Sequence, residues 1–201
     1  MGRLNGKVAI ITGGSSGIGE ATVRLFVEKG AKVLLFARNE ERSNKIVKNL
    51  GRNVHFFKGD VTIESDVKNA VDTVVEDWGK LDCIYNNAGI LGATGPIEMI
   101  SEEGFEETIG VLLKGVFFGI KHAARIMKPQ GFGSIINCSS NASLIVVNRN
   151  TLYSTCKAAV NKLTLNMASE LGEYGIRVNA VCVLALFLLG YGVVELRFLM
   201  K

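Results

Sequence analysis

Two side chains with complementary acid–base chemistry lie four residues apart in the second half of the chain. Tyr153 and Lys157 are the ends of the segment Tyr-Ser-Thr-Cys-Lys. Residues at this spacing share one face of a helix. A lysine ammonium beside a phenol favours the phenolate and lowers a pKa that is about 10 in water. The pair could therefore exchange a proton with a carbonyl or hydroxyl group, although a tyrosine and a lysine at this spacing are common by chance.

A glycine-rich segment follows the first apolar run. It reads Thr-Gly-Gly-Ser-Ser-Gly-Ile-Gly over residues 12–19, and a helical pattern comes next. Glycine lets the backbone turn tightly and approach a pyrophosphate, and the N-terminus of the following helix offers free N–H groups and a positive dipole end. Gly13, Gly17 and Gly19 fit this role. A flexible strand-to-helix turn is the alternative, but the position between the first strand and the first helix favours a phosphate loop.

Short apolar runs alternate with longer segments of helical character along the chain. Runs that are apolar on both faces are typical of parallel strands covered by helices on each side. No linker or low-complexity segment interrupts the alternation, and 201 residues suit one well-packed domain. We therefore expect a single-domain α/β protein with a doubly wound parallel sheet. The expected strands are 8–11, 33–36, 54–57, 81–85, 134–138 and 176–183.

Four motifs together resemble the short-chain dehydrogenase/reductase family. They are the Thr-Gly-x-x-x-Gly-x-Gly loop, Asp60-Val61 at the end of the third strand, Asn86-Asn-Ala-Gly89 after the fourth, and Tyr-x-x-x-Lys. Asn86–Gly89 could be an ordinary turn and Asp60 a helix-capping neighbour, but the four motifs occur in the order of the family. The resemblance implies a Rossmann-type fold and an oxidoreductase that transfers a hydride between NADP(H) or NAD(H) and an alcohol or ketone substrate.

The resemblance also implies roles for individual residues. Ser140 lies 13 residues before Tyr153, at the position of the family's substrate-orienting serine, and Ser139 is the second choice. Ser140, Tyr153 and Lys157 are therefore the expected catalytic residues, with the Ser140 hydroxyl donating to a developing oxyanion. Two serines that merely end a strand and cap the next segment are the alternative. The expected cofactor-binding residues are Gly13, Ser15, Ser16, Gly17, Ile18, Gly19, Arg38, Asp60, Val61, Asn87, Ala88, Gly89, Tyr153 and Lys157.

The end of the second strand bears on the choice of cofactor. An NAD-preferring fold usually carries an acidic residue there for the ribose 2′-hydroxyl, whereas this chain has Ala37 followed by Arg38. A guanidinium can pair with the 2′-phosphate of NADP, and no carboxylate is present to repel that phosphate. We expect a preference for NADP(H), with NAD(H) possible. A solvated arginine on a loop is the alternative.

The chain departs from the family pattern at two places. Leu112 stands where the resemblance implies an asparagine that holds a water in the proton relay and stabilises a local helix distortion, and a leucine cannot hydrogen-bond. The resemblance then stops after Val181, and the segment that follows differs from the family's substrate loop and last strand. We expect slow or absent turnover. A nucleotide-binding pseudoenzyme and a non-productive truncated isoform are the alternative functions.

The two departures set the expected domain boundaries. A dinucleotide-binding domain is expected over residues 1–183, without the last strand of the family fold, followed by a divergent apolar tail over 184–201. The apolar stretch 180–194 is shorter than the roughly 20 residues that cross a bilayer. We therefore do not expect a membrane span.

Composition argues against several classes of partner. The formal net charge is +4 with 19 acidic residues and no basic run, so nucleic acid is not an expected partner. Four scattered cysteines suggest reduced thiols in a cytoplasmic protein, and the only histidines, His55 and His122, are too isolated to indicate a metal site. The family resemblance implies a homodimer or homotetramer through the fourth and fifth helices.

Overall fold

The computed structural model describes residues 2–183, and the expected tail over 184–201 lies outside them. Six parallel strands form one sheet in the order β3-β2-β1-β4-β5-β6. Every expected strand is present, with ends that differ by up to two residues, and the single-domain doubly wound fold is confirmed. The strands are β1 (Val8–Thr12), β2 (Lys32–Ala37), β3 (Val54–Lys58), β4 (Cys83–Asn86), β5 (Gly133–Ser140) and β6 (Ile176–Val183).

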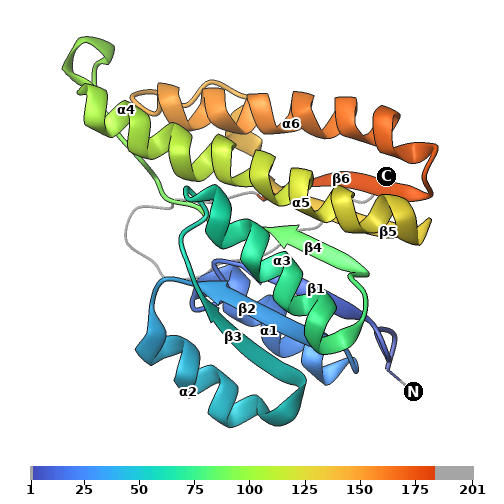
Figure 1. The fold of residues 1–201 in the computed structure, drawn as a ribbon. Coiled ribbons are helices and arrows are strands. Elements are labelled where there is room, and N and C mark those ends of the chain that lie inside the picture. Colours follow the sequence, from blue (N-terminus) through green and yellow to red (C-terminus); the bar gives the residue numbers. More distant parts are fainter. Residues whose placement is uncertain (1, 184–201) are drawn as a thin grey trace.

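Helices connect the strands and lie on both faces of the sheet (Figure 1). On one face, α1 and α2 enclose a core that includes Ile11 and Leu35. On the other face, α3, α5 and α6 enclose a larger core that includes Ile10 and Leu34. Neighbouring residues of one strand thus belong to opposite cores, which is why the strands read as continuous apolar runs. The helices are α1 (Gly17–Glu28), α2 (Glu40–Leu50), α3 (Glu64–Trp78), α4 (Glu102–Ile109), α5 (Gly115–Gln130) and α6 (Thr151–Gly172).

The strand order reverses between β1 and β4. The chain moves from β1 outward through β2 to β3, and then crosses to β4 on the other side of β1. In open α/β sheets, ligands bind outside the carboxyl ends of the strands at this switch point. The segments that follow β1 and β4 therefore position any site.

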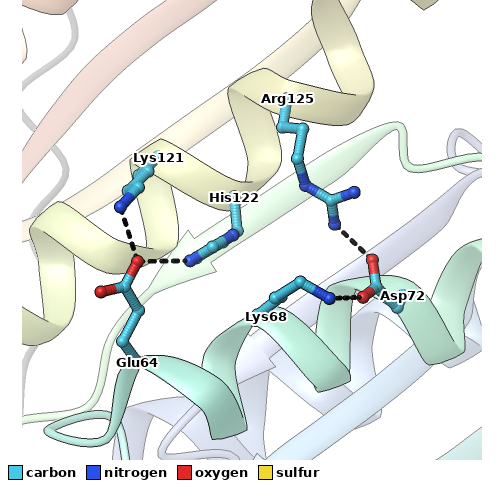
Figure 2. Close-up of polar contacts among 6 residues, drawn as sticks. All are labelled: Glu64, Lys68, Asp72, Lys121, His122 and Arg125. Atoms are coloured by element: carbon cyan, nitrogen blue, oxygen red, sulfur yellow. Dashed lines mark hydrogen bonds and ion pairs between the residues drawn. The ribbon is translucent and has the colours of Figure 1, made fainter.

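Two clusters of charged side chains join α3 to α5, which lie side by side (Figure 2). Near the start of α3, Glu64 accepts hydrogen bonds from Lys121 at 2.6 Å and from the His122 ring at 3.1 Å. Farther along, Asp72 pairs with Lys68 of its own helix and with Arg125 of α5. These contacts hold α5 against α3.

His122 is the buried member of the first cluster, with 5% of its surface exposed. Burial lowers the pKa of His122, and the opposing effect of Glu64 does not restore it. The ring is therefore neutral at neutral pH, with Nε2–H donating to Glu64, and Nδ1 has no hydrogen-bond partner within residues 2–183. No helix of the described residues is both long and apolar enough to cross a membrane.

Candidate active site

The glycine loop joins β1 to α1 through a backbone that leaves little room for side chains. Gly13 and Gly17 adopt φ values of +67° and +53°, a left-handed region that favours glycine. A Cβ on Gly19 would lie 2.2 Å from the Gly13 carbonyl oxygen, so any side chain there would collide. Ser16 precedes the helix without capping it through its side chain. The Ser16 side chain thus leaves the N-terminal N–H groups of α1 uncapped. An anion-binding site at a helix N-terminus requires such free N–H groups.

The segment after β4 is fastened to the end of β1. The backbone N–H groups of Asn87 and Ala88 donate to the Thr12 hydroxyl at 2.9 and 3.0 Å, and the Asn87 side chain donates to the Thr12 carbonyl at 3.0 Å. Sequence reasoning did not single out Thr12, although it opens the glycine motif. These three hydrogen bonds, called the Thr12 clasp below, set the distance between the glycine loop and the Asn86–Gly89 turn.

A buried amide chain supports this turn from below. The Asn86 amide donates to Asn137 of β5, and the Asn137 amide donates to Thr164 of α6, both at 2.9 Å. A Cβ on Gly119 of α5 would lie 1.9 Å from the Asn86 side-chain oxygen, so only glycine lets α5 pack there. The paired amides thus join the Asn86–Gly89 turn to β5 and α6.

Asp60 and Arg38 lie together after β3 and β2. Burial raises the pKa of Asp60, but hydrogen bonds from the Thr62 N–H and hydroxyl, both 2.9 Å long, and the nearby Arg38 guanidinium lower it more. The carboxylate is therefore ionised, 3.5 Å from the Arg38 Nη1. In this structure its two oxygens face Thr62 and Arg38. Arg42, which sequence reasoning did not select, lines the same cavity as Arg38 and Asp60.

Tyr153 and Lys157 share one face of α6, as their spacing predicts. The Lys157 ammonium does not, however, lie where it would lower the pKa of Tyr153. The buried Lys157 ammonium donates to the Cys138 carbonyl at 2.7 Å and lies 5.5 Å from the centroid of the Tyr153 ring. Burial raises the pKa of Tyr153, and a hydrogen bond with Ser140 only partly opposes this. The expected depression of the Tyr153 pKa by Lys157 is therefore wrong for this structure, because the ammonium faces a carbonyl and the ring rather than the phenol oxygen.

The two adjacent serines of β5 point to different surroundings. The Ser139 hydroxyl donates to the Lys157 backbone carbonyl at 3.2 Å and is almost completely buried. Ser140 lines the cavity that contains Tyr153, and its hydroxyl also accepts from the Ala142 N–H at 3.2 Å. Of the two, only Ser140 can meet a ligand in this geometry.

Leu112 lies in a π-helical turn over Gly110–Lys114, between α4 and α5. Its side chain is fully buried in an apolar cluster with Leu152 and Cys156, and Tyr153 packs against this cluster. The implied need for an asparagine to stabilise the helix distortion does not hold here, since the distortion forms around a leucine. Apolar packing supports the turn instead.

One cavity of about 690 Å³ connects these residues. Every expected catalytic residue lines it, and of the expected cofactor-binding residues only Gly17 does not, because its role is to turn the loop. A dinucleotide fits this arrangement, since the bare backbone at Gly13 and Gly19 leaves the room that a pyrophosphate needs. Sequence reasoning missed further lining residues, which come from α2 and the residue before it, from the π-helical turn, and from the segments after β4 and β5: Asn39, Arg42, Ile90, Leu91, Val111, Asn141, Ala142, Ile145, Val147 and Asn150.

Comparisons with known proteins agree with this geometry. The family model described as short chain dehydrogenase matches residues 7–186. The chain is 43% identical over 182 residues to "Short chain aldehyde dehydrogenase 1" of Euphorbia lathyris, with 89% of this chain and 63% of the relative covered. It is 46% identical over 182 residues to "(+)-borneol dehydrogenase 2" of Salvia officinalis, with 89% and 64% covered. The chain thus spans somewhat less than two thirds of the length of these relatives.

Solved structures share the fold. A 3-ketoacyl-(acyl-carrier-protein) reductase from Brucella melitensis, complexed with NADH, superposes with a TM-score of 0.86 at 31% identity over 90% of this chain and 76% of that one. An NAD⁺-bound xylitol dehydrogenase gives a TM-score of 0.86 at 34% identity over 90% and 71%. With the glycine loop, the asparagine turn and the Ser140–Tyr153–Lys157 group on one cavity, this chain belongs to the short-chain dehydrogenase/reductase family.

Proposed function

We propose that this protein is an NADP(H)-dependent oxidoreductase that interconverts a small alcohol and its carbonyl compound. The observation that carries the proposal is one continuous cavity, which runs from the glycine cradle of Gly13 and Gly19 to Ser140 and Tyr153. A cofactor in the cradle and a carbonyl beside Tyr153 would share this cavity. When bound, the nicotinamide would supply or accept the hydride.

The protein side chains would handle the proton. Burial raises the pKa of Tyr153, so its phenol is protonated at neutral pH and suited to donate a proton to a carbonyl oxygen. Ser140, which hydrogen-bonds with Tyr153, would hold the same oxygen. Lys157 would position the group through its bond to the Cys138 carbonyl.

Two cations support the choice of NADP(H). Arg38 and Arg42 both line the cavity, and Ala37 stands where an acidic residue would repel a 2′-phosphate. The pair between Arg38 and Asp60 is 3.5 Å long and the Arg38 side chain is mostly exposed, so the guanidinium can rearrange around a phosphate at little cost. The two solved structures compared above hold NADH and NAD⁺, and NADP(H) is thus a distinguishing claim for this chain.

The direct test is to titrate the purified chain with NADPH and NADH by fluorescence, and then to follow NADPH absorbance with a panel of ketones. We expect tighter binding of NADPH than of NADH, and slow turnover that Tyr153→Phe removes. Preference for NADH would contradict the cofactor assignment. Turnover that survives Tyr153→Phe would contradict the assigned chemistry.

A second candidate function is nucleotide binding without turnover. The specific observation is Leu112, which places a fully buried apolar side chain beside the Tyr153 cluster where the family resemblance implies a hydrogen-bonding asparagine. NADPH binding in the absence of turnover with any ketone of the panel would favour this candidate. Light scattering on the same sample would test the expected homodimer or homotetramer.

A further inference from the structure

The cavity has two ends of opposite character. The glycine-loop end, formed by residues 13–19 with Arg38, Arg42 and Asp60, carries charged side chains. The apolar end surrounds Tyr153 and is built from three segments: the loop after β4, the π-helical turn and the loop after β5. Its apolar members are Ile90, Leu91, Val111, Ala142, Ile145 and Val147.

Among residues 2–183, Lys157 is the only charged residue that lines the apolar end. The Lys157 ammonium is 3% exposed and donates to the Cys138 carbonyl, so it is not free to pair with a ligand anion. The polar groups nearby are also partly engaged, since the Ser140 hydroxyl donates to the Asn141 side chain at 3.3 Å. A charged or polyhydroxylated ligand would lose water here and gain few partners.

The rim of the apolar end exposes large hydrophobic side chains. Leu144, Ile145 and Val146 are consecutive, with exposed fractions of 74%, 56% and 98%, and Leu91 is 50% exposed on the loop after β4. Single exposed apolar residues are ordinary, but a run that continues into a cavity marks a ligand-binding surface. Ile145 and Leu91 belong to both the rim and the lining.

The two loops are held in place by bonds of their own. The Gly95 N–H donates to the Arg149 carbonyl at 2.9 Å and so ties the loop after β4 to the loop after β5. The Ala93 N–H donates to the Thr108 hydroxyl of α4 at 2.9 Å. Arg149 has a φ of +57°, which is uncommon for a residue other than glycine. The apolar end is thus a formed surface rather than one that a ligand must create.

We infer that the substrate of this site is an uncharged ketone or secondary alcohol with a bulky hydrocarbon skeleton. The reacting oxygen faces Tyr153 and Ser140, and the skeleton packs between Leu91 and Ile145. Hydroxy acids, polyols and phosphate-bearing acyl thioesters are disfavoured, because the part of this end that residues 2–183 form offers no free charge and few polar side chains, among them Asn150. This inference rests on the proposed function.

The test uses the full chain saturated with NADPH and three probe ketones of graded character: cyclohexanone, 2-decalone and 4-oxocyclohexanecarboxylate. Each added carbon that leaves water favours binding. We expect kcat/KM for 2-decalone to exceed that for cyclohexanone at least tenfold, and the carboxylate to be the poorest substrate. If turnover is slow, the same order is expected for dissociation constants from quenching of bound NADPH fluorescence.

Two matched variants locate the effect. Ile145→Asn should remove most of the preference for 2-decalone and leave the NADPH dissociation constant unchanged. Leu25→Asn makes the same kind of exposed apolar-to-amide change on α1, away from the cavity, and should alter neither quantity. Equal responses to all three ketones, or a preference that survives Ile145→Asn, would overturn the inference. Failure to bind NADPH would overturn the proposed function instead, so the two failures are distinguishable.

Discussion

At the glycine-loop end of the cavity, glycines leave the backbone uncovered, whereas at the apolar end hydrophobic side chains line the cavity. The first end depends on where Gly13 and Gly19 leave space and on the Thr12 clasp. The second depends on which side chains two loops and the π-helical turn present. A cofactor common to many proteins can be held by backbone geometry, while a particular substrate needs particular side chains. The two ends should therefore respond differently to substitution.

The largest expected effect is at the glycine loop. Gly19→Ala places a Cβ 2.2 Å from the Gly13 carbonyl and 2.6 Å from the Asn87 amide, so the backbone must move. We expect NADPH affinity to fall about 100-fold or more, which is about 2.7 kcal/mol. Fluorescence titration measures it. Gly51→Ala is the control: Gly51 combines a φ of +72° with a ψ of −153°, which essentially only glycine adopts, and has open space around it, so the variant should lose about 1–3 kcal/mol of stability and no affinity.

The apolar end and the proton-handling group meet at Leu112. Leu112→Asn should raise kcat about tenfold if the implied asparagine role applies, and should lower the free energy of unfolding by about 1–3 kcal/mol, because an amide enters an apolar cluster. Steady-state rates and urea unfolding measure the two effects. Leu112→Met keeps the apolar character and should change neither strongly. A kcat that does not respond to asparagine would show that the leucine is not what limits turnover.

Cofactor choice should depend on one charge. Arg38→Ala should weaken NADPH binding about tenfold, or about 1.4 kcal/mol, and leave NADH binding unchanged, because only NADPH carries the 2′-phosphate. Paired titrations with the two cofactors measure this. Arg52→Ala removes an exposed arginine that does not line the cavity and should affect neither cofactor. Equal losses for both cofactors would argue that Arg38 acts on the fold rather than on the phosphate.

The smallest expected effect concerns the α3–α5 contact, which lies outside both ends. The pKa of His122 is lowered in the folded protein, mainly by burial, so its neutral form is favoured there. The stability linked to this group is present above the unfolded pKa of about 6.5 and is lost as the pH falls below it. His122→Gln should therefore flatten the pH dependence of the unfolding free energy between about pH 7 and 5. Urea unfolding across that range measures this slope.

The same variant also tests whether the contact is separate from the site. His122→Gln should leave the NADPH dissociation constant at neutral pH unchanged, since His122 does not line the cavity. Glu64 affects stability in a different pH range. The hydrogen bond from Lys121 lowers the pKa of Glu64, so its contribution to the free energy of unfolding is lost only below about pH 4.5. An unchanged slope in His122→Gln would mean that burial does not keep the ring neutral.

The sequence by itself determined the fold and the glycine-loop end. Strands buried on both faces produce continuous apolar runs, and the tight turn between β1 and α1 admits few residues besides glycine, so both leave local patterns. The spacing of Tyr153 and Lys157 likewise placed them on one helical face. Ser140 was placed by family resemblance, and its position on the cavity agrees with that choice.

Only the tertiary structure decided the direction of the charges and the character of the apolar end. The Lys157 ammonium turns to the Cys138 carbonyl because a strand that is distant in the sequence ends beside it, and burial then raises the pKa of Tyr153. Arg42 reaches the cavity from α2 and Ile145 from the loop after β5, and neither belongs to a motif. Local patterns report backbone conformation, whereas burial and charge pairing depend on which distant segments meet, and these decide the chemistry that Tyr153 can perform.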